Sequence, residues 1–407
     1  MNKNTYCVLA DCGLSTQNNG SVTICNQSQT LFQNKNKELI LLQDYSLKEV
    51  WNNNPTRDEI RNDLANGIRH TNCNNCWAEE DAGKSSQRMN YNQRYPDLKP
   101  LPEQPRIMIF KPGNTCNLGC RHCSPMVSSF WIKDRWTVEI KPVSDKSYAD
   151  YAREFSTARD SFRDENDGVW QVLNEWIPGF VFYDLYGAEP TLIAPLMNVL
   201  DEAVRQGVAK DQDLHINTNG TIWRDSYRDV FSQFKSASIG ISLDGIGAQA
   251  DYMRYPSKWD AVYSNLKKYH ALMTDFPQID VHISATVSLL NIYYVDEIWD
   301  FLTKEGFRCD FNLLHQPKYI NARIAPKSAK EQIKKKLLAF EPEQSANLWE
   351  REREFTIKFL DLDFENAEEH FSEFWHFTNE YDKLRNESYA DTFPESYAIL
   401  SATKLDY

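Results

Sequence analysis

The sequence has no apolar stretch long enough to cross a bilayer, and its first residues, MNKNTYCVLADCGL, lack the basic-then-apolar pattern of a secretion signal. Basic residues are in the minority, because 45 Lys and Arg face 58 Asp and Glu, for a net charge of -13. This balance argues against strong non-specific binding to nucleic acid or to anionic membranes, which requires basic surface. We expect a cytoplasmic protein with neither a membrane nor a nucleic acid as its partner.

Cysteine is nearly absent from the last two thirds of the chain. Only Cys309 follows residue 123, and it shares a strand face with Phe311 and Leu313, which indicates core packing. The other cysteines are Cys7, Cys12, Cys25, Cys73, Cys76, Cys116, Cys120 and Cys123. An odd total without a secretion signal argues against a disulfide framework, and clustered cysteines in a reducing compartment more often bind metal. We therefore expect metal chemistry in the first third of the chain.

Changes in composition divide the chain into three parts. Residues 1–100 are polar and rich in Asn, with one or two short helices expected in Ser46–Gly67. The segment Tyr95–Pro105 contains four prolines and is typical of a linker. The predicted domains are an N-terminal cysteine module at 1–100, an α/β domain at 101–320 and a helical extension at 321–407. We expect no functional site in the extension, which is acidic and aromatic.

Strands alternate with helical segments in the middle part, which predicts an α/β fold with a parallel sheet. The expected strands are Arg106–Phe110, Val181–Gly187, Asp213–Gly220, Ser236–Gly245, Asp280–Ser288 and Cys309–His315. Each strand has one polar face, for example His215, Asn217 and Asn219 in the third. A six-stranded barrel of the TIM type with a polar lumen explains this alternation, and an open sheet with exposed polar faces is the alternative. Ligand sites of such barrels lie at the carboxyl ends of the strands.

The segment GNTCNLGCRHCSPM, at 113–126, places Cys116, Cys120 and Cys123 just after the first expected strand. A closed zinc site would need a fourth ligand, and His122 is poorly placed to share a metal with its neighbour Cys123. A cubane iron–sulfur cluster held by only three cysteines would instead keep one iron without a protein ligand. Such an open position can bind a substrate, as it does in catalytic zinc sites.

The stretch CNLGCRHC resembles the signature of the radical S-adenosylmethionine (SAM) enzymes, with His122 at the position of an aromatic residue. The resemblance implies an incomplete (β/α)6 barrel and a 4Fe-4S cluster whose open iron binds SAM. It also implies one-electron cleavage of SAM to a 5′-deoxyadenosyl radical that removes hydrogen from a substrate, with a flavodoxin- or ferredoxin-type electron donor. Chemistry of this kind belongs to the cofactor, while the protein binds, orients and shields.

Further positions match that family in order, over about residues 106–317. The stretch YGAEP resembles its GGEP motif, with Ala188 in place of the second Gly, and implies that Gly187, Ala188 and Glu189 hold the SAM ammonium group. The resemblance also assigns SAM contacts to Asn219, Ser242, Asp244 and Arg254. Taken alone, GAEP is more often a plain turn, and Arg254 is nearly as often an ordinary surface arginine.

The remaining early cysteines form a second set. Its layout resembles the SPASM/Twitch modules of radical SAM enzymes, in which two separate cysteines and a later Cys-x2-Cys pair bind an auxiliary 4Fe-4S cluster. With twelve residues before Gly20, Cys7 fits that spacing and Cys12 does not, so the implied ligands are Cys7, Cys25, Cys73 and Cys76. Four thiolates also suit zinc, and spacing does not choose between the two metals. This module usually follows the barrel, whereas here it precedes it.

The reaction that the resemblance implies is an oxidative modification, with a peptide, a protein or a small metabolite as the substrate. Tyr186, His282 and His315 are the candidate catalytic residues, and Ser284 and Asn312 are further candidate substrate contacts. Each of them is also a candidate for an ordinary hydrogen-bonded polar group. The opposing hypothesis is a non-catalytic iron–sulfur carrier or scaffold that does not bind SAM.

Overall fold

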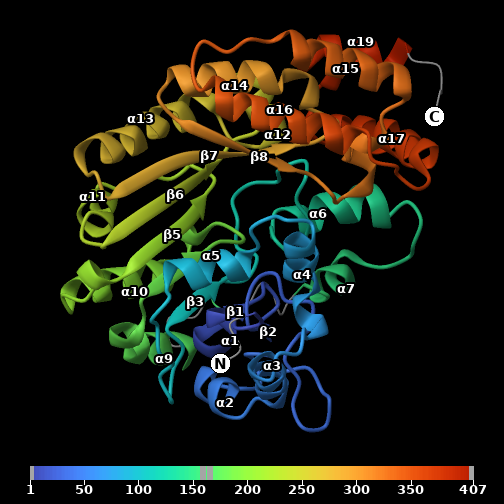
Figure 1. Cartoon of the computed structure of the whole chain (residues 1–407). Helices are drawn as coiled ribbons and strands as arrows, with labels where there is room; N and C mark the ends of the chain where they lie inside the picture. Colours follow the sequence, from blue (N-terminus) through green and yellow to red (C-terminus); the bar gives the residue numbers. More distant parts are fainter. Residues whose placement is uncertain (1–3, 156–161, 163–167, 403–407) are drawn as a thin grey trace. The chain divides into compact units, whose positions relative to one another are not determined.

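The computed structural model describes residues 4–155, 162 and 168–402 (Figure 1). The chain divides into two compact units, each assembled from separate segments. Unit 1 comprises 1–116, 153–217 and 225–238, and unit 2 comprises 117–152, 218–224 and 239–407. Each unit is described by itself below.

The described strands form one unclosed sheet, which confirms the predicted α/β class and the incomplete barrel. Their order is β2 (Val22–Thr23), β1 (Gly13–Thr16), β3 (Ile107–Phe110), β4 (Phe182–Leu185), β5 (Asp213–Thr218), β6 (Ser236–Ser242), β7 (Ile279–Val287) and β8 (Arg308–Leu313). The pairs β1–β3, β3–β4, β4–β5 and β7–β8 are parallel, and β1–β2 is antiparallel. All six expected strands are confirmed, and β1 and β2 were not predicted.

The expected alternation of faces is visible in the burial of the strands. Along β7, apolar residues such as Val281 and Ile283 are fully buried, while the intervening His282 and Ser284 are partly exposed. In unit 1 the register aligns Asp184 of β4 with His215 of β5, so the two lie on the same face. In β7 the apolar Val281 and Ile283 therefore lie on one face, and His282 and Ser284 lie on the other.

The first two helices after β2 begin where the sequence supplies capping residues. Ser46 and Glu49 form a capping box at the start of α2, and Asn54 caps α3 with Pro55 in its first turn. The helices of this unit are α1 (Val8–Cys12), α2 (Leu47–Asn52), α3 (Pro55–Ala65), α4 (Asn74–Asp81), α5 (Gln87–Arg94), α9 (Gly168–Trp176), α10 (Ala194–Arg205) and α11 (Ser226–Phe231). Tyr91 and Tyr95, in and just after α5, pack on Phe182 of β4.

Unit 2 contains the predicted C-terminal helical extension. Its helices are α6 (Trp131–Arg135), with a π-helical turn at Trp136–Ile140, α12 (Ala248–Met253), α13 (Trp259–Asp275), α14 (Val295–Lys304), α15 (Lys327–Ala339), α16 (Ala346–Leu360), α17 (Ala367–Arg385), α18 (Tyr389–Thr392) and α19 (Pro394–Ala402). Helix α7 (Tyr148–Arg153) ends where unit 1 resumes. Helix α13 packs on β7, and α14 and α16 pack on β8 (Figure 1).

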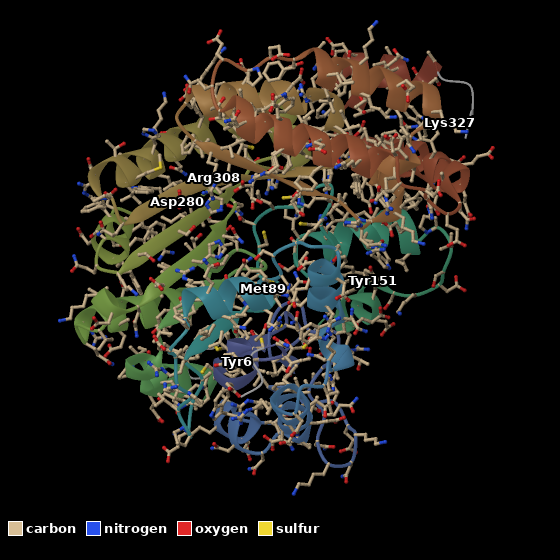
Figure 2. The ribbon with its side chains drawn as sticks, viewed as in Figure 1. Tyr6, Met89, Tyr151, Asp280, Arg308 and Lys327 are labelled. Carbon is tan, nitrogen blue, oxygen red and sulfur yellow. The ribbon has the colours of Figure 1, made fainter. Side chains whose placement is uncertain are left out.

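Strands β7 and β8 also carry a surface ion pair near their starts. Arg308 Nη2 lies 3.5 Å from Asp280 Oδ2, and Figure 2 shows the two side chains next to each other.

Within the described residues, we find no helix with the length and apolar character needed to cross a membrane.

Candidate functional site

The three-cysteine loop follows strand β3, whose residues are all buried. Its first cysteine, Cys116, ends the first segment of unit 1, and Cys120 and Cys123 belong to unit 2. Within unit 2 the N–H of Cys123 donates to the carbonyl of Cys120 at 2.9 Å, which closes a turn between the two thiols. Cys120 is buried, whereas Cys116 and Cys123 are half-buried. Two of the three thiols are thus partly open to solvent.

Arg254 and Asp244 form a buried ion pair beside this loop in unit 2. Arg254 Nη2 lies 2.9 Å from Asp244 Oδ2, and Arg254 Nη1 donates to Cys120 Sγ at 3.7 Å. A bond from Cys123 and the charge of Arg254 together lower the pKa of the Cys120 thiol, although burial opposes them. Arg254 is therefore not the surface arginine of the simpler interpretation, because its charge is directed at a cysteine.

His122 lies next to the same pair. Its Nδ1 is 3.5 Å from Asp244 Oδ2 and makes no hydrogen bond to the described part of the chain. Burial lowers the pKa of the His122 imidazole to about 4, although Asp244 opposes the shift. At neutral pH the ring is therefore uncharged and behaves as a flat, mostly apolar group, in keeping with the aromatic position that it occupies in the motif.

The predicted Glu189 motif contacts the start of the same loop within unit 1. The N–H of Glu189 donates to the carbonyl of Thr115, the residue before Cys116, at 3.1 Å. The Glu189 carboxylate is fully buried and accepts from the hydroxyl of Thr191 at 2.7 Å. Gly187 and Ala188 both have positive φ, 84° and 54°, and this local geometry turns the chain sharply after β4.

The carboxyl end of β5 is tied to the loop by side-chain amides in unit 2. Asn219 Nδ2 donates to Asn117 Oδ1 at 2.8 Å, and Asn219 Oδ1 accepts from the Thr221 hydroxyl at 2.6 Å. Ser242 is the last residue of β6, and Asp244 follows it. The structure therefore brings Asn219, Asp244 and Arg254 into contact with residues 117–122 or with one another, and their role in binding SAM stays a prediction.

The four N-terminal cysteines of the predicted ligand set line one small cavity in unit 1. Its walls are Cys7, Leu9, Ile24, Cys25, Gln27, Asn72, Cys73, Cys76, Gln87 and Arg88. Cys12 is not among them, and burial raises the pKa of its thiol to about 12 against the opposing charges of Arg106, Arg57 and Arg61. Arg88 is held by Glu80, with its Nη2 2.6 Å from Glu80 Oε2.

In this cavity burial outweighs the one favourable charge at Cys73, that of Arg88, which acts to lower the pKa of the Cys73 thiol. Burial raises the pKa of Cys7 to about 12 and that of Cys73 to about 11. Across the described ranges 4–155, 162 and 168–402, no three His, Cys, Asp or Glu side chains stand at metal-ligand geometry. The four thiols share a cavity without converging on one point, and a metal would have to displace their protons.

The three candidate catalytic residues have different surroundings. Tyr186 follows β4, and burial together with the charge of Asp184 raises the pKa of its phenol. His282 lies on the polar face of β7, with Nδ1 3.3 Å from Asp280. His315 is exposed and packs edge-on against Phe359 of α16. No contact described for these residues brings them to the three-cysteine loop, and their roles stay predictions.

Sequence reasoning missed the residues that hold the loop from the C-terminal extension. Arg385 Nη1 donates to the carbonyl of Gly119 at 2.8 Å, and Arg121 Nη2 lies 2.6 Å from Asp382 Oδ1. It also missed the pairing of Asp184 with His215, whose Nδ1 is 2.7 Å from Asp184 Oδ1. The alternating polar face was the only signal for that pair, and Arg385 had no local signal.

No protein-family model and no curated protein matches this sequence. Solved structures with a similar fold include native anSMEcpe with bound AdoMet, at 19% identity, covering 55% of this chain and 57% of that one with a TM-score of 0.34. Streptococcus suis SuiB bound to S-adenosylmethionine has 15% identity, 76% and 64% coverage and a TM-score of 0.34. SuiB bound to precursor peptide SuiA has 12% identity, 95% and 74% coverage and a TM-score of 0.31. The chain spans just over half the length of anSMEcpe, and all these similarities are of fold.

Proposed function

We propose that this chain is a radical SAM enzyme that binds a 4Fe-4S cluster through Cys116, Cys120 and Cys123. The observation that carries the proposal is the contact of Arg254 with the sulfur of Cys120, inside a loop where three thiols follow a buried strand. A buried cation directed at a thiolate suits a negatively charged iron–sulfur site. Arg254 Nε is buried and makes no hydrogen bond to the described residues, so it retains a donor.

When bound, a cluster of this type with SAM supplies a one-electron cleavage that generates a carbon radical. The chain's own residues would position the substrate of that step. Thr115 and Glu189 join the loop to the turn after β4, and Asn219 joins it to the end of β5 through Asn117. In this proposal the carboxylate of Glu189 and the amide of Asn219 bind polar groups of SAM.

We also propose an auxiliary site at Cys7, Cys25, Cys73 and Cys76, supported by the cavity that these four thiols line. Four cysteine ligands would leave such a site closed, and therefore suited to electron transfer rather than to substrate binding. Iron, sulfide and zinc analysis after anaerobic reconstitution separates the two metals. About eight iron atoms per chain support two cubane clusters, whereas about four with one zinc assign the N-terminal site to zinc.

The decisive test is cleavage of SAM by the reconstituted protein under a strong reductant. We expect 5′-deoxyadenosine from the wild type and none from Cys120→Ser. Cys12→Ser is the matched control, because Cys12 is also buried and lies outside both cysteine sets. A wild type that holds iron yet forms no 5′-deoxyadenosine would be the carrier or scaffold of the alternative hypothesis.

The substrate class to test first is a peptide, because SuiB, one of the proteins of similar fold, is bound to a precursor peptide. A small metabolite is the second class. The proposed outcome is oxidative, with one electron leaving through the auxiliary site to a donor–acceptor protein of the flavodoxin or ferredoxin type. An assay in which SAM is regenerated at each turnover would contradict the oxidative part of the proposal.

A further inference from the structure

Helix α17 ends at an arginine that is almost completely enclosed in unit 2. The side chain of Arg385 is 1% exposed, and the next residue, Asn386, has a φ of 53° that turns the chain away. Arg385 Nη1 donates to the carbonyl of Gly119 at 2.8 Å, and Nε donates to Asp134 Oδ2 at 3.1 Å. A buried arginine of this kind is costly unless its charge and donors are used. Here it is used on the backbone between the first two loop cysteines.

Aromatic residues fix the plane of this guanidinium group. The central carbon of the guanidinium group, Arg385 Cζ, lies 4.8 Å from the ring centroids of both Trp131 and Tyr255. Trp131 in turn donates from Nε1 to the carbonyl of Cys120 at 2.8 Å, and the carbonyl of Tyr255 accepts from the N–H of Gly119. The planar group and its two aromatic neighbours thus hold three consecutive peptide units of the loop, an arrangement that a lysine cannot reproduce.

A second contact joins the same C-terminal stretch to the next loop residue. Arg121 Nη2 lies 2.6 Å from Asp382 and 2.7 Å from Glu387. The Asp382 carboxylate also accepts from the Tyr252 hydroxyl at 2.8 Å. Residues 382–387 therefore hold residues 119–121 through hydrogen bonds and ion pairs, although the two segments lie more than 250 positions apart in the sequence.

The Arg385 charge also acts on the chemistry of the loop. The buried guanidinium group of Arg385 is hydrogen-bonded to the carbonyl of Gly119, the residue immediately before Cys120. Asp134 partly balances this charge, with its Oδ2 3.0 Å from Arg385 Nη2. A positive group beside an iron–sulfur cluster stabilises the reduced, more negative state and so raises its reduction potential.

From these contacts we propose that Arg385 is a positioning residue for the three-cysteine loop, through which the C-terminal extension sets the stability and the reduction potential of the cluster bound there. This inference rests on the proposed function. It assigns a role to a region for which the sequence predicted no site.

The test compares Arg385→Lys and Arg385→Gln with Lys383→Gln, a control on the same helix whose side chain is 73% exposed. Both Arg385 variants should lose iron to a chelator about ten-fold faster than wild type, as expected when a group supporting metal ligands is removed. Arg385→Lys keeps the charge and should keep the reduction potential, whereas Arg385→Gln should lower it. Lys383→Gln should match wild type in both measurements.

The readout that isolates the three-cysteine cluster is its electron paramagnetic resonance spectrum with and without SAM, since only a cluster with an open iron binds SAM. We expect a SAM-dependent change in wild type that is weakened in Arg385→Gln. If wild type shows no such change, the proposed function fails and this inference fails with it. If wild type responds and both Arg385 variants match Lys383→Gln in spectrum, iron loss and potential, only the inference is overturned.

If the Arg385 variants do not fold, a substitution of Trp131 provides a second test of how the loop is held. Trp131→Phe keeps the aromatic ring and removes the donor to the Cys120 carbonyl. It should accelerate iron loss while the potential stays unchanged. A folded Trp131→Phe protein with wild-type iron retention would contradict positioning through this group.

Discussion

Replacing Asp244 by Asn tests how much the buried ion pair between Asp244 and Arg254, beside the cysteine loop, contributes to the free energy of unfolding. The side chain is 0% exposed, lies 2.9 Å from Arg254 Nη2 and accepts from the N–H of Thr286 at 2.7 Å. Asn preserves the shape and one acceptor but removes the countercharge of a buried arginine. Breaking a buried ion pair from one side typically costs about 3–5 kcal/mol, and the acceptor that Asn retains places the expected loss near 3 kcal/mol.

Asp280→Asn provides the matched control, because this carboxylate is also on the sheet of unit 2. It is 48% exposed, and its partners Arg308 and His282 lie 3.5 and 3.3 Å away (Figure 2). An exposed pair at these distances contributes between about 0 and 1 kcal/mol. Urea unfolding followed by tryptophan fluorescence measures both variants under the same conditions. Equal losses for the two substitutions, or a loss below about 1 kcal/mol for Asp244→Asn, would refute the reasoning.

Two further substitutions test local features of unit 1. Ala188→Gly should stabilise the protein by about 1 kcal/mol, because Ala188 has a φ of 54°, a conformation that costs any residue with a β-carbon about that much. A lower melting temperature for this variant would contradict the prediction. Burial would raise the pKa of Glu80, but bonds from Arg88 and Ser86 outweigh it and lower the pKa. The ionised Glu80 side chain therefore stabilises the folded protein above the pKa that glutamate has in the unfolded chain. This stabilisation is lost as the pH falls through the lower pKa of Glu80 in the folded protein. The stability difference between wild type and Glu80→Gln should shrink between about pH 5 and pH 3 in chemical unfolding, and a constant difference would exclude the linkage.

Six of the eight described strands could be predicted because each carries a local pattern. In β7, apolar and polar residues alternate over nine positions, and every apolar residue is buried, together with the polar Thr286. Strands β1 and β2 have no such pattern, since they are four and two residues long and buried throughout. Strand β1 is defined by its pairing with β3, in which Gly13 is aligned with Ile107. Because Gly13 and Ile107 are far apart in the sequence, a short stretch of sequence around either residue does not indicate that the two strands pair.

The cysteines that we propose as ligands could be chosen from the sequence because their spacing along the chain suggests them. Cys7 and Cys12 illustrate how spacing becomes geometry. They lie at the two ends of the short helix α1, and five residues correspond to about 140° of rotation beyond one full turn. The two thiols therefore point in different directions, and Cys7 lines the cavity with Cys25 while Cys12 does not.

The residues that hold the loop could not be predicted, because their own sequence context suggests something else. Arg385 lies in a helix with many charged residues, where arginine is usually solvated, yet it is buried against Gly119, 266 positions earlier. Arg121 stands inside the cysteine motif and still gave no indication of its partner, Asp382. Ligand identity depends on short spacings, whereas the support of those ligands depends on which distant charges the fold brings together. Variation at Arg385 or Asp382 should therefore alter the properties of the cluster that we propose there while leaving the cysteine motif intact.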